Sequence, residues 1–180
     1  MIKYLSKEEV KTLFRVIRNP RDLAIFTVAY WRGLRASEVG MLRFSSFDRE
    51  GNRLQVVRLK NSLGGDYLLN PAEAKVIRAW IRRRGTSSGA LFPSNRGKGI
   101  SRQQLDKLMR KYGAEAGLPV DKRHFHVLKH SIATHLRESG VDILEIKDWL
   151  GHRNINSTLQ YTHLSDPKRD QLSRKVFAEW

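Results

Sequence analysis

The chain contains no cysteine, so it can build neither a disulfide framework nor a thiolate metal site. It also lacks long hydrophobic runs: the longest, Leu23–Trp31, is interrupted by Thr27 and is too short to cross a bilayer. The first residues include Lys3, Lys7 and Glu8, which is not the pattern of a signal peptide. Together these absences predict a cytoplasmic protein.

Acidic residues are few relative to basic ones. The chain has 34 Lys and Arg against 18 Asp and Glu, a formal net charge of +16. Such an excess favours a polyanionic partner, because each neutralised phosphate of a nucleic acid releases condensed counterions. A basic ribosomal-type protein or a membrane-surface protein would show the same excess, so charge alone does not identify the partner.

The order of apolar, capping and turn residues predicts a mainly α fold with a small antiparallel β-sheet (α+β). The 180 residues suffice for a single domain, 1–180, with a real core. Ser6-Lys7-Glu8-Glu9 is a capping box, and Asn70-Pro71-Ala72-Glu73 is a second helix start. Two runs, Arg53–Lys60 and Asp66–Leu69, flank a turn and predict a hairpin with Lys60 near its tip. Helices are expected over about 7–17, 21–32, 37–42, 71–84, 101–116, 125–138, 141–150 and 156–161, and from 166 onward.

Histidines cluster in one short segment: four of the six lie between His124 and His135. On a helix, His126, Lys129 and His130 share one face with Ala133 and Arg137, while an apolar face lies beside them. Three interpretations are open: a solvated basic face, a metal site made by His126 and His130 at i, i+4, or an anion site. The absence of cysteine and the presence of Lys129 between the two histidines favour an anion.

Four further residues stand at positions suited to phosphate chemistry. Arg35 follows a glycine turn at the start of a helix, where free N–H groups favour an anion, although an ion pair with Glu38 is the simpler alternative. Lys60 is expected near a hairpin tip, and His152 follows Leu150-Gly151 on a turn. Tyr161 comes nine residues later. A phenol has a pKa near ~10, so its attack on a phosphodiester requires a base or strong positive potential nearby.

These spaced motifs resemble the catalytic domain of tyrosine recombinases, the family of phage integrases and chromosome-dimer resolvases. The resemblance runs from Leu5-Ser6-Lys7-Glu8-Glu9 to Tyr161-Thr162-His163, nearly the whole chain. It rests on five motifs in the right order: Gly33-Leu34-Arg35-Ala36-Ser37-Glu38, Lys60 on a hairpin, the segment His126-Val127-Leu128-Lys129-His130, Leu150-Gly151-His152, and Tyr161.

The resemblance implies a site-specific DNA recombinase and a role for each motif. Tyr161 would attack a DNA phosphate to give a 3′-phosphotyrosyl bond, and Arg35 would bind the non-bridging oxygens. His126 would assist proton transfer, His152 would donate a hydrogen bond to the phosphate, and Lys60 would protonate the leaving 5′-oxygen. Glu38 and His130 would support these groups. No metal and no cofactor is expected.

The chain departs from the family pattern in two ways. Lys129 stands where the family usually has arginine, so the charge is kept while the bidentate fork is lost; we expect retained activity. The usual N-terminal core-binding domain is expected to be absent, because the resemblance begins almost at Met1. A protein without this domain would contact DNA from one side only and should bind it less tightly.

Double-stranded DNA is the expected partner, and the protein should associate with the nucleoid. Basic residues outside the motifs are candidate backbone contacts: Lys98, Arg102, Lys107, Arg110, Lys122 and Arg123. The tail from Asp166 to Trp180 is expected to form a helix that packs on a neighbouring protomer in a tetramer on DNA. Two other functions stay open, a type IB topoisomerase-like enzyme and a non-catalytic DNA-binding regulator.

Overall fold

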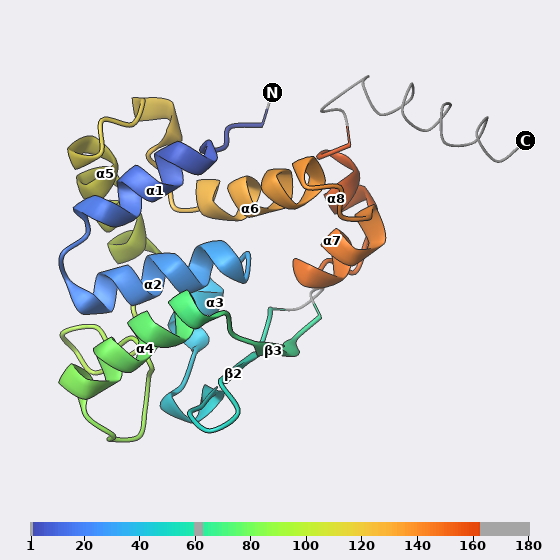
Figure 1. Ribbon diagram of the computed structural model, residues 1–180. Helices are drawn as coiled ribbons and strands as arrows, with labels where there is room; N and C mark the ends of the chain where they lie inside the picture. The colour runs from blue at the N-terminus through green and yellow to red at the C-terminus, as the bar shows by residue number, and fades with distance from the viewer. Residues whose placement is uncertain (1, 60–62, 163–180) are drawn as a thin grey trace, which may run out of the picture.

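The computed structural model describes residues 2–59 and 63–162. Lys60 and the predicted tail helix from Asp166 lie outside these residues. Within them, eight α-helices enclose one core: α1 (Lys7–Val16), α2 (Pro20–Trp31), α3 (Ala36–Met41), α4 (Pro71–Arg84), α5 (Arg102–Glu115), α6 (Val127–Glu138), α7 (Ile143–Trp149) and α8 (Asn156–Leu159). Two 3-10 turns, Phe44–Ser46 and Val120–Lys122, connect them. The predicted fold class, mainly α with a small antiparallel sheet, is confirmed (Figure 1).

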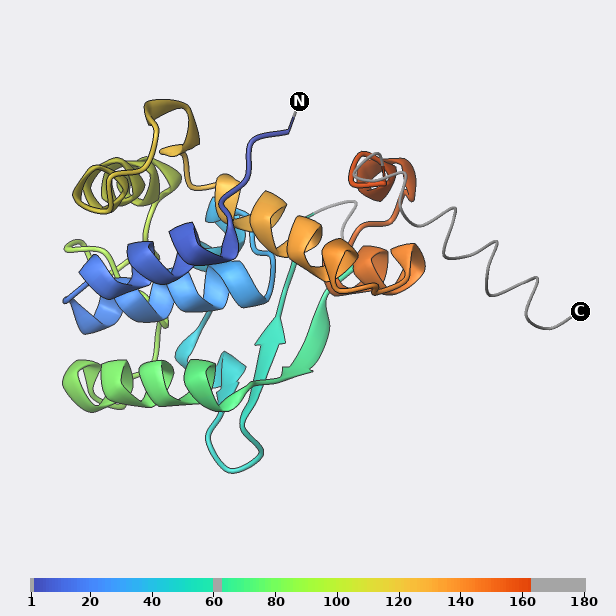
Figure 2. The same cartoon turned by 45° about the horizontal axis from the view of Figure 1, so that its top comes forward.

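Helix α2 lies at the centre of the fold and contacts α1, α3, α4 and α6 (Figures 1 and 2). Its residues from Ala24 to Tyr30 are all buried, which explains why its sequence is apolar on every side. The predicted capping box at Ser6 is present, and the predicted helix start at Asn70 is a capping box as well. Ser6 Oγ accepts from the Glu9 amide at 3.1 Å and starts α1, and Asn70 Oδ1 accepts from the Glu73 amide at 3.0 Å and starts α4.

The sheet has three antiparallel strands, β1 (Phe47–Asp48), β2 (Arg53–Val56) and β3 (Gly65–Leu68), in the order β1-β2-β3. The predicted hairpin is the β2–β3 pair, in a register that places Val56 opposite Gly65. Strand β1 is not predicted by the sequence pattern, because two residues are too few to show alternation.

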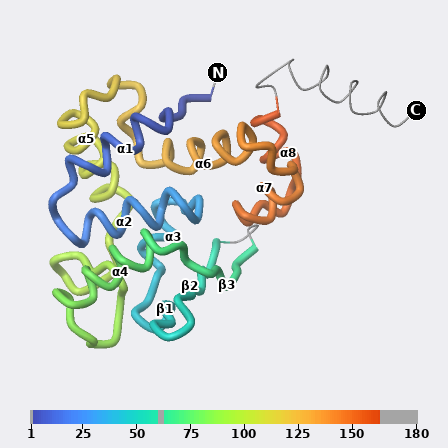
Figure 3. The backbone as a smooth tube through the Cα atoms, in the orientation of Figure 1, coloured from blue at the N-terminus to red at the C-terminus, as the bar shows by residue number. Residues whose placement is uncertain are grey.

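The hairpin reaches across the molecule to the turn after α7 (Figure 3). The Leu63 amide donates to the Gly151 carbonyl at 2.9 Å, which joins two segments far apart in the sequence. No helix in the described ranges has both the length and the apolarity that crossing a bilayer requires.

Helix α6 differs from its prediction. It begins at Val127 rather than near Phe125, and His126 is its N-cap residue. Of the three interpretations of its basic residues, the solvated face is wrong, because Lys129 and Ala133 are both buried. Helix α6 packs against α2 and α7, so little of its surface is left to solvent.

The backbone of the turn after α7 requires glycine at position 151. Gly151 has φ +65°, and a Cβ there would lie 2.4 Å from the Leu63 carbonyl oxygen and 2.5 Å from Arg58 Cδ. We expect Gly151→Ala to lower the free energy of unfolding by about 2–4 kcal/mol, through backbone strain together with overpacking.

Gly140→Ala is the matched control for this prediction. Gly140 also has a left-handed φ, +86°, but a Cβ there would meet nothing within 4 Å. Its cost should be only the backbone strain, about 1 kcal/mol. Urea unfolding of both variants measures the difference, and equal losses would contradict the contact argument.

Candidate active site

Five of the six predicted catalytic residues line one pocket of about 410 Å³. The pocket is formed by Arg35, His126, Lys129, His152, Asn156, Ser157, Gln160 and Tyr161. The sixth, Lys60, lies outside the described residues. None of the eight lining residues is acidic, so the pocket suits an anion.

Arg35 reaches the pocket from the turn between α2 and α3. Gly33 adopts φ +56° after α2 and redirects the chain. Arg35 forms the ion pair with Glu38, which was one of its two predicted alternatives. Its Nη1 donates to Glu38 Oε1 at 3.0 Å, and its backbone amide donates to Oε2 of the same carboxylate at 2.7 Å. The Glu38 side chain is fully buried, whereas that of Arg35 is 35% exposed. Glu38 therefore orients the guanidinium from its buried side, and the opposite side stays accessible.

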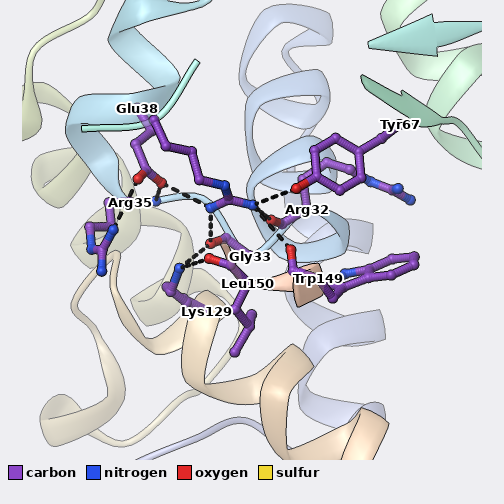
Figure 4. A network of polar contacts seen from close by, with 9 residues as sticks. Arg32, Gly33, Arg35, Glu38, Tyr67, Lys129, Trp149 and Leu150 are labelled. Atoms are coloured by element: carbon purple, nitrogen blue, oxygen red, sulfur yellow. Dashed lines mark hydrogen bonds and ion pairs between the residues drawn. The ribbon is translucent and has the colours of Figure 1, made fainter. Parts of the chain in front are cut away.

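Lys129 projects from α6 between two turns. Its ammonium donates to the Gly33 carbonyl at 2.8 Å and to the Leu150 carbonyl at 3.0 Å (Figure 4). Two of its three donors are therefore used by the protein, and one is left for a ligand in the pocket. Burial lowers its pKa to about 7, and the nearby positive charges of Arg58 and Arg35 act in the same direction.

His152 stands on the turn after α7, as expected. Its Nδ1 lies 3.0 Å from Thr158 Oγ1, which fixes the ring and leaves Nε2 for another partner. Burial lowers the pKa of His152 to about 3, with smaller contributions from Lys129 and Arg35. The imidazole is therefore neutral at neutral pH and acts as a neutral hydrogen-bonding group.

Tyr161 is buried at the side of the pocket, and its partner is His130. The Tyr161 hydroxyl lies 2.8 Å from His130 Nδ1. Burial raises the pKa of Tyr161 to about 12, and Arg35 opposes this rise. Burial lowers the pKa of His130 to about 4, so its neutral ring can accept the phenolic proton.

His126 takes a different place from the one expected of the proton acceptor. Its ring packs edge-on against His130, with centroids 4.5 Å apart. The residue is solvent-exposed, yet desolvation of its ring by the surrounding protein lowers its pKa to about 4, and the charges of His130 and Lys129 contribute to this shift. The hydrogen-bond partner of the Tyr161 hydroxyl is His130, for which only a supporting role was predicted.

The metal interpretation of His126 and His130 finds no third ligand. In residues 2–59 and 63–162, no three histidine, aspartate or glutamate side chains form a group that could hold a metal ion. His130 Nδ1 is also occupied by the Tyr161 hydroxyl.

Three of the six expected DNA contacts line a second hollow of about 750 Å³ that shares Arg35 and His126 with the first pocket. They are Arg102 and Arg110 from α5, and Arg123. Lys98 and Lys107 are exposed and lie outside this hollow. Lys122 pairs instead with Glu9 at 2.8 Å.

Arg58 is a buried residue near the pocket that was not among the predicted site residues. Its side chain is fully buried behind the pocket, and its Nη1 lies 3.3 Å from Glu38 Oε2. A signal was present, because Leu54, Val56 and Arg58 alternate along one strand direction and all point inward. Three residues that line the pocket were not predicted either: Asn156, Ser157 and Gln160. Thr158, whose hydroxyl contacts His152 Nδ1, was also not predicted.

Comparison with known proteins places this geometry in a family. Residues 3–168 match the model of the phage integrase family. The type 1 fimbriae regulatory protein FimE of Escherichia coli (strain K12) is 34% identical over 169 residues, which covers 89% of this chain and 85% of FimE. The tyrosine recombinase XerA of Thermococcus onnurineus is 34% identical over 176 residues, 91% of this chain.

The fold matches as well. The crystal structure of XerA recombinase superposes with a TM-score of 0.82 and 28% identity over 98% of this chain. This chain spans 65% of that crystallised chain and 58% of the Thermococcus protein. The resemblance inferred from the five motifs is thereby confirmed.

Proposed function

The chain belongs to the phage integrase family, and we propose from this membership that it is a site-specific recombinase that cuts and rejoins DNA strands through a 3′-phosphotyrosyl intermediate. One observation carries the proposal: Arg35, Lys129 and His152, from three separate segments, surround one pocket beside the Tyr161 phenol. A phosphodiester in this pocket would meet cations and neutral donors on one side and a nucleophile on the other.

In the cleavage step, the Tyr161 oxygen forms a bond to phosphorus while the bond from phosphorus to the 5′-oxygen breaks. The phenolic proton passes to a neutral imidazole, and His130 is the one in contact. Lys60, the predicted general acid, supplies a proton to the departing 5′-oxygen. Arg35, Lys129 and His152 stabilise the added charge on the non-bridging oxygens.

Rejoining reverses these steps with another 5′-hydroxyl as nucleophile. The phosphotyrosyl link keeps the energy of the broken phosphodiester, so strand exchange needs no nucleotide hydrolysis. His130 returns the proton to the Tyr161 oxygen as that oxygen leaves.

Double-stranded DNA is the proposed substrate. The net charge of +16 supplies a general attraction, and the hollow lined by Arg102, Arg110 and Arg123 leads from the pocket and would follow the phosphate backbone. We also propose that copies assemble into a tetramer on DNA through the tail from Asp166, and that the protein works in the nucleoid.

The experiment that tests the function is covalent capture on nicked suicide DNA fragments. A pool of sequences replaces the unknown target site, and the buffer contains a chelator and no ATP. We expect a denaturant-resistant adduct whose proteolysis yields a nucleotide attached to the peptide that contains Tyr161.

Other outcomes would point to other functions. DNA binding without any adduct would favour a regulator, and FimE is named as a regulatory protein. Relaxation of supercoiled DNA without exchange between two sites would favour a topoisomerase-like enzyme.

A further inference from the structure

Arg58 is a fully buried cation whose best contacts are with backbone carbonyls. Its Nη2 donates to the Arg32 carbonyl at 2.9 Å and to the Trp149 carbonyl at 3.1 Å. Longer contacts of 3.3 to 3.4 Å reach the Glu38 carboxylate, the Gly33 carbonyl and the Tyr67 hydroxyl. The partners of Arg58 are labelled in Figure 4. A buried guanidinium needs such acceptors, so its position is tightly determined.

These acceptors belong to the two turns that present phosphate-binding residues. The carbonyls of Arg32 and Gly33 precede Arg35 by three and two residues, and the carbonyl of Trp149 precedes His152 by three residues. Each turn contains a glycine with left-handed φ, Gly33 at +56° and Gly151 at +65°. Regular helix hydrogen bonds end at both turns, so other donors must hold these carbonyls.

Direct packing makes the same connection. A Cβ on Gly151 would come within 2.5 Å of Arg58 Cδ and Nε, so the second turn lies directly on the Arg58 side chain. On the other side, Arg58 and Arg35 share the two oxygens of Glu38. Movement of Arg58 would therefore shift both the orientation of Arg35 and the path of the chain into His152.

The charge of Arg58 also acts on the pocket. Its guanidinium contributes to lowering the pKa of Lys129 and of His152. Three cations, Arg35, Arg58 and Lys129, face the single carboxylate of Glu38. This cluster keeps an excess of positive charge that a phosphate would neutralise.

Resting on the proposed function, we propose that Arg58 is a positioning residue for DNA cleavage, which fixes the Arg35 turn and the His152 turn at the spacing that one phosphate requires. Arg58 does not touch the substrate; it acts through Glu38 and the carbonyls of the two turns. Its positive charge also adds to the effect of burial in lowering the pKa of Lys129.

The test compares Arg58→Met and Arg58→Lys with the wild type in single-turnover cleavage of a suicide substrate at saturating DNA. Because a displacement of about 1 Å can cost on the order of 100-fold in rate, we expect Arg58→Met to cleave about 100-fold more slowly with unchanged DNA affinity. We expect Arg58→Lys to recover part of the rate. In Arg58→Met, the alkaline fall in the cleavage rate should move to higher pH, because a neighbouring cation is removed from Lys129.

Arg84→Met is the matched control. Arg84 also donates to backbone carbonyls, to Ala90 at 2.7 Å and to Ser87 at 2.7 Å, but it holds a loop that contributes nothing to the pocket. It should lower the melting temperature without changing the cleavage rate of the folded protein or its pH dependence.

Three results would overturn the proposal: wild-type rates in folded Arg58→Met, a rate loss that follows only the unfolded fraction, or an unchanged alkaline limb. If Arg58→Met does not fold, Arg58→Lys decides alone, and a wild-type rate in that variant rejects the role. An inactive wild type would instead reject the proposed function, so the two failures are distinguishable.

Discussion

Replacement of Tyr161 by phenylalanine is expected to abolish the covalent adduct while DNA binding is retained. The substitution removes only the hydroxyl oxygen, whose partner in this structure is His130 Nδ1 at 2.8 Å. No other group is expected to replace the nucleophile, so single-turnover cleavage should fall by at least ~10³-fold, a loss of about 4 kcal/mol of transition-state stabilisation. Gel analysis of a labelled suicide substrate under denaturing conditions measures the adduct directly.

The chain offers a close control in Tyr30→Phe. The Tyr30 hydroxyl also lies 2.8 Å from the Nδ1 of a histidine of α6, His135. Burial raises the pKa of both Tyr30 and Tyr161 to about 12. Because Tyr30 is not among the residues that line the pocket, its variant should lose stability and keep the adduct. An adduct with Tyr161→Phe, or none with Tyr30→Phe in the folded state, would contradict the assignment of the nucleophile.

The surroundings of Tyr161 imply that the phenol is activated only when substrate is bound. With a pKa of about 12 the phenol is protonated, and with a pKa of about 4 His130 is neutral, so the pair begins with its proton on oxygen. Transfer to His130 creates a buried imidazolium, which the negative charge of a phosphate in the pocket would stabilise. In the free protein the Tyr161 phenol therefore stays protonated.

Local sequence signals were sufficient for most of the fold. The capping boxes at Ser6 and Asn70 place the starts of α1 and α4 because their hydrogen bonds are made within four residues. Strand β1 and the burial of Lys129 could not be read in the same way. Strand β1 has only two residues, and the burial of Lys129 depends on the carbonyl of Gly33, which is distant in the sequence.

The pocket was predictable from spaced motifs, but the contacts within it were not. The motifs named Arg35, His152 and Tyr161, and the structure brings all three to one pocket. The choice of His130 over His126 as partner of the phenol depends on how the segment that carries Tyr161 lies against α6, a contact between residues 31 apart that no local pattern encodes. Leu54, Val56 and Arg58 alternate inward, yet a fully buried arginine is so rare that alternation alone does not predict one at position 58.

Lys129→Met is the second substitution expected to have a large effect. It removes a buried cation from the pocket and leaves the carbonyls of Gly33 and Leu150 without their donor. Loss of one such electrostatic group typically costs about 10²–10³-fold in rate, and we expect a cleavage loss of this order. Lys11→Met, which removes a surface lysine paired with Glu8 at 2.7 Å, serves as the control with unchanged cleavage.

The low pKa of Lys129 predicts how the stability of the protein and its cleavage rate change with pH. Its pKa falls from the usual 10.5 to about 7 in the folded chain. Between these values the unfolded chain binds the proton and the folded chain does not, so the stability contributed by this group rises with pH through that window. Cleavage should change in the opposite direction, because kcat/KM loses the Lys129 charge as pH rises above about 7.

Lys129→Arg separates the loss of this charge from other alkaline effects. Arginine keeps its proton throughout the range, so the alkaline limb of kcat/KM should disappear while that of the wild type remains. The limb of kcat in the wild type should lie at higher pH than the limb of kcat/KM, because bound phosphate raises the pKa of the buried ammonium. Identical pH profiles for wild type and Lys129→Arg would show that the lysine stays charged, and that its two carbonyl acceptors outweigh burial in setting its pKa.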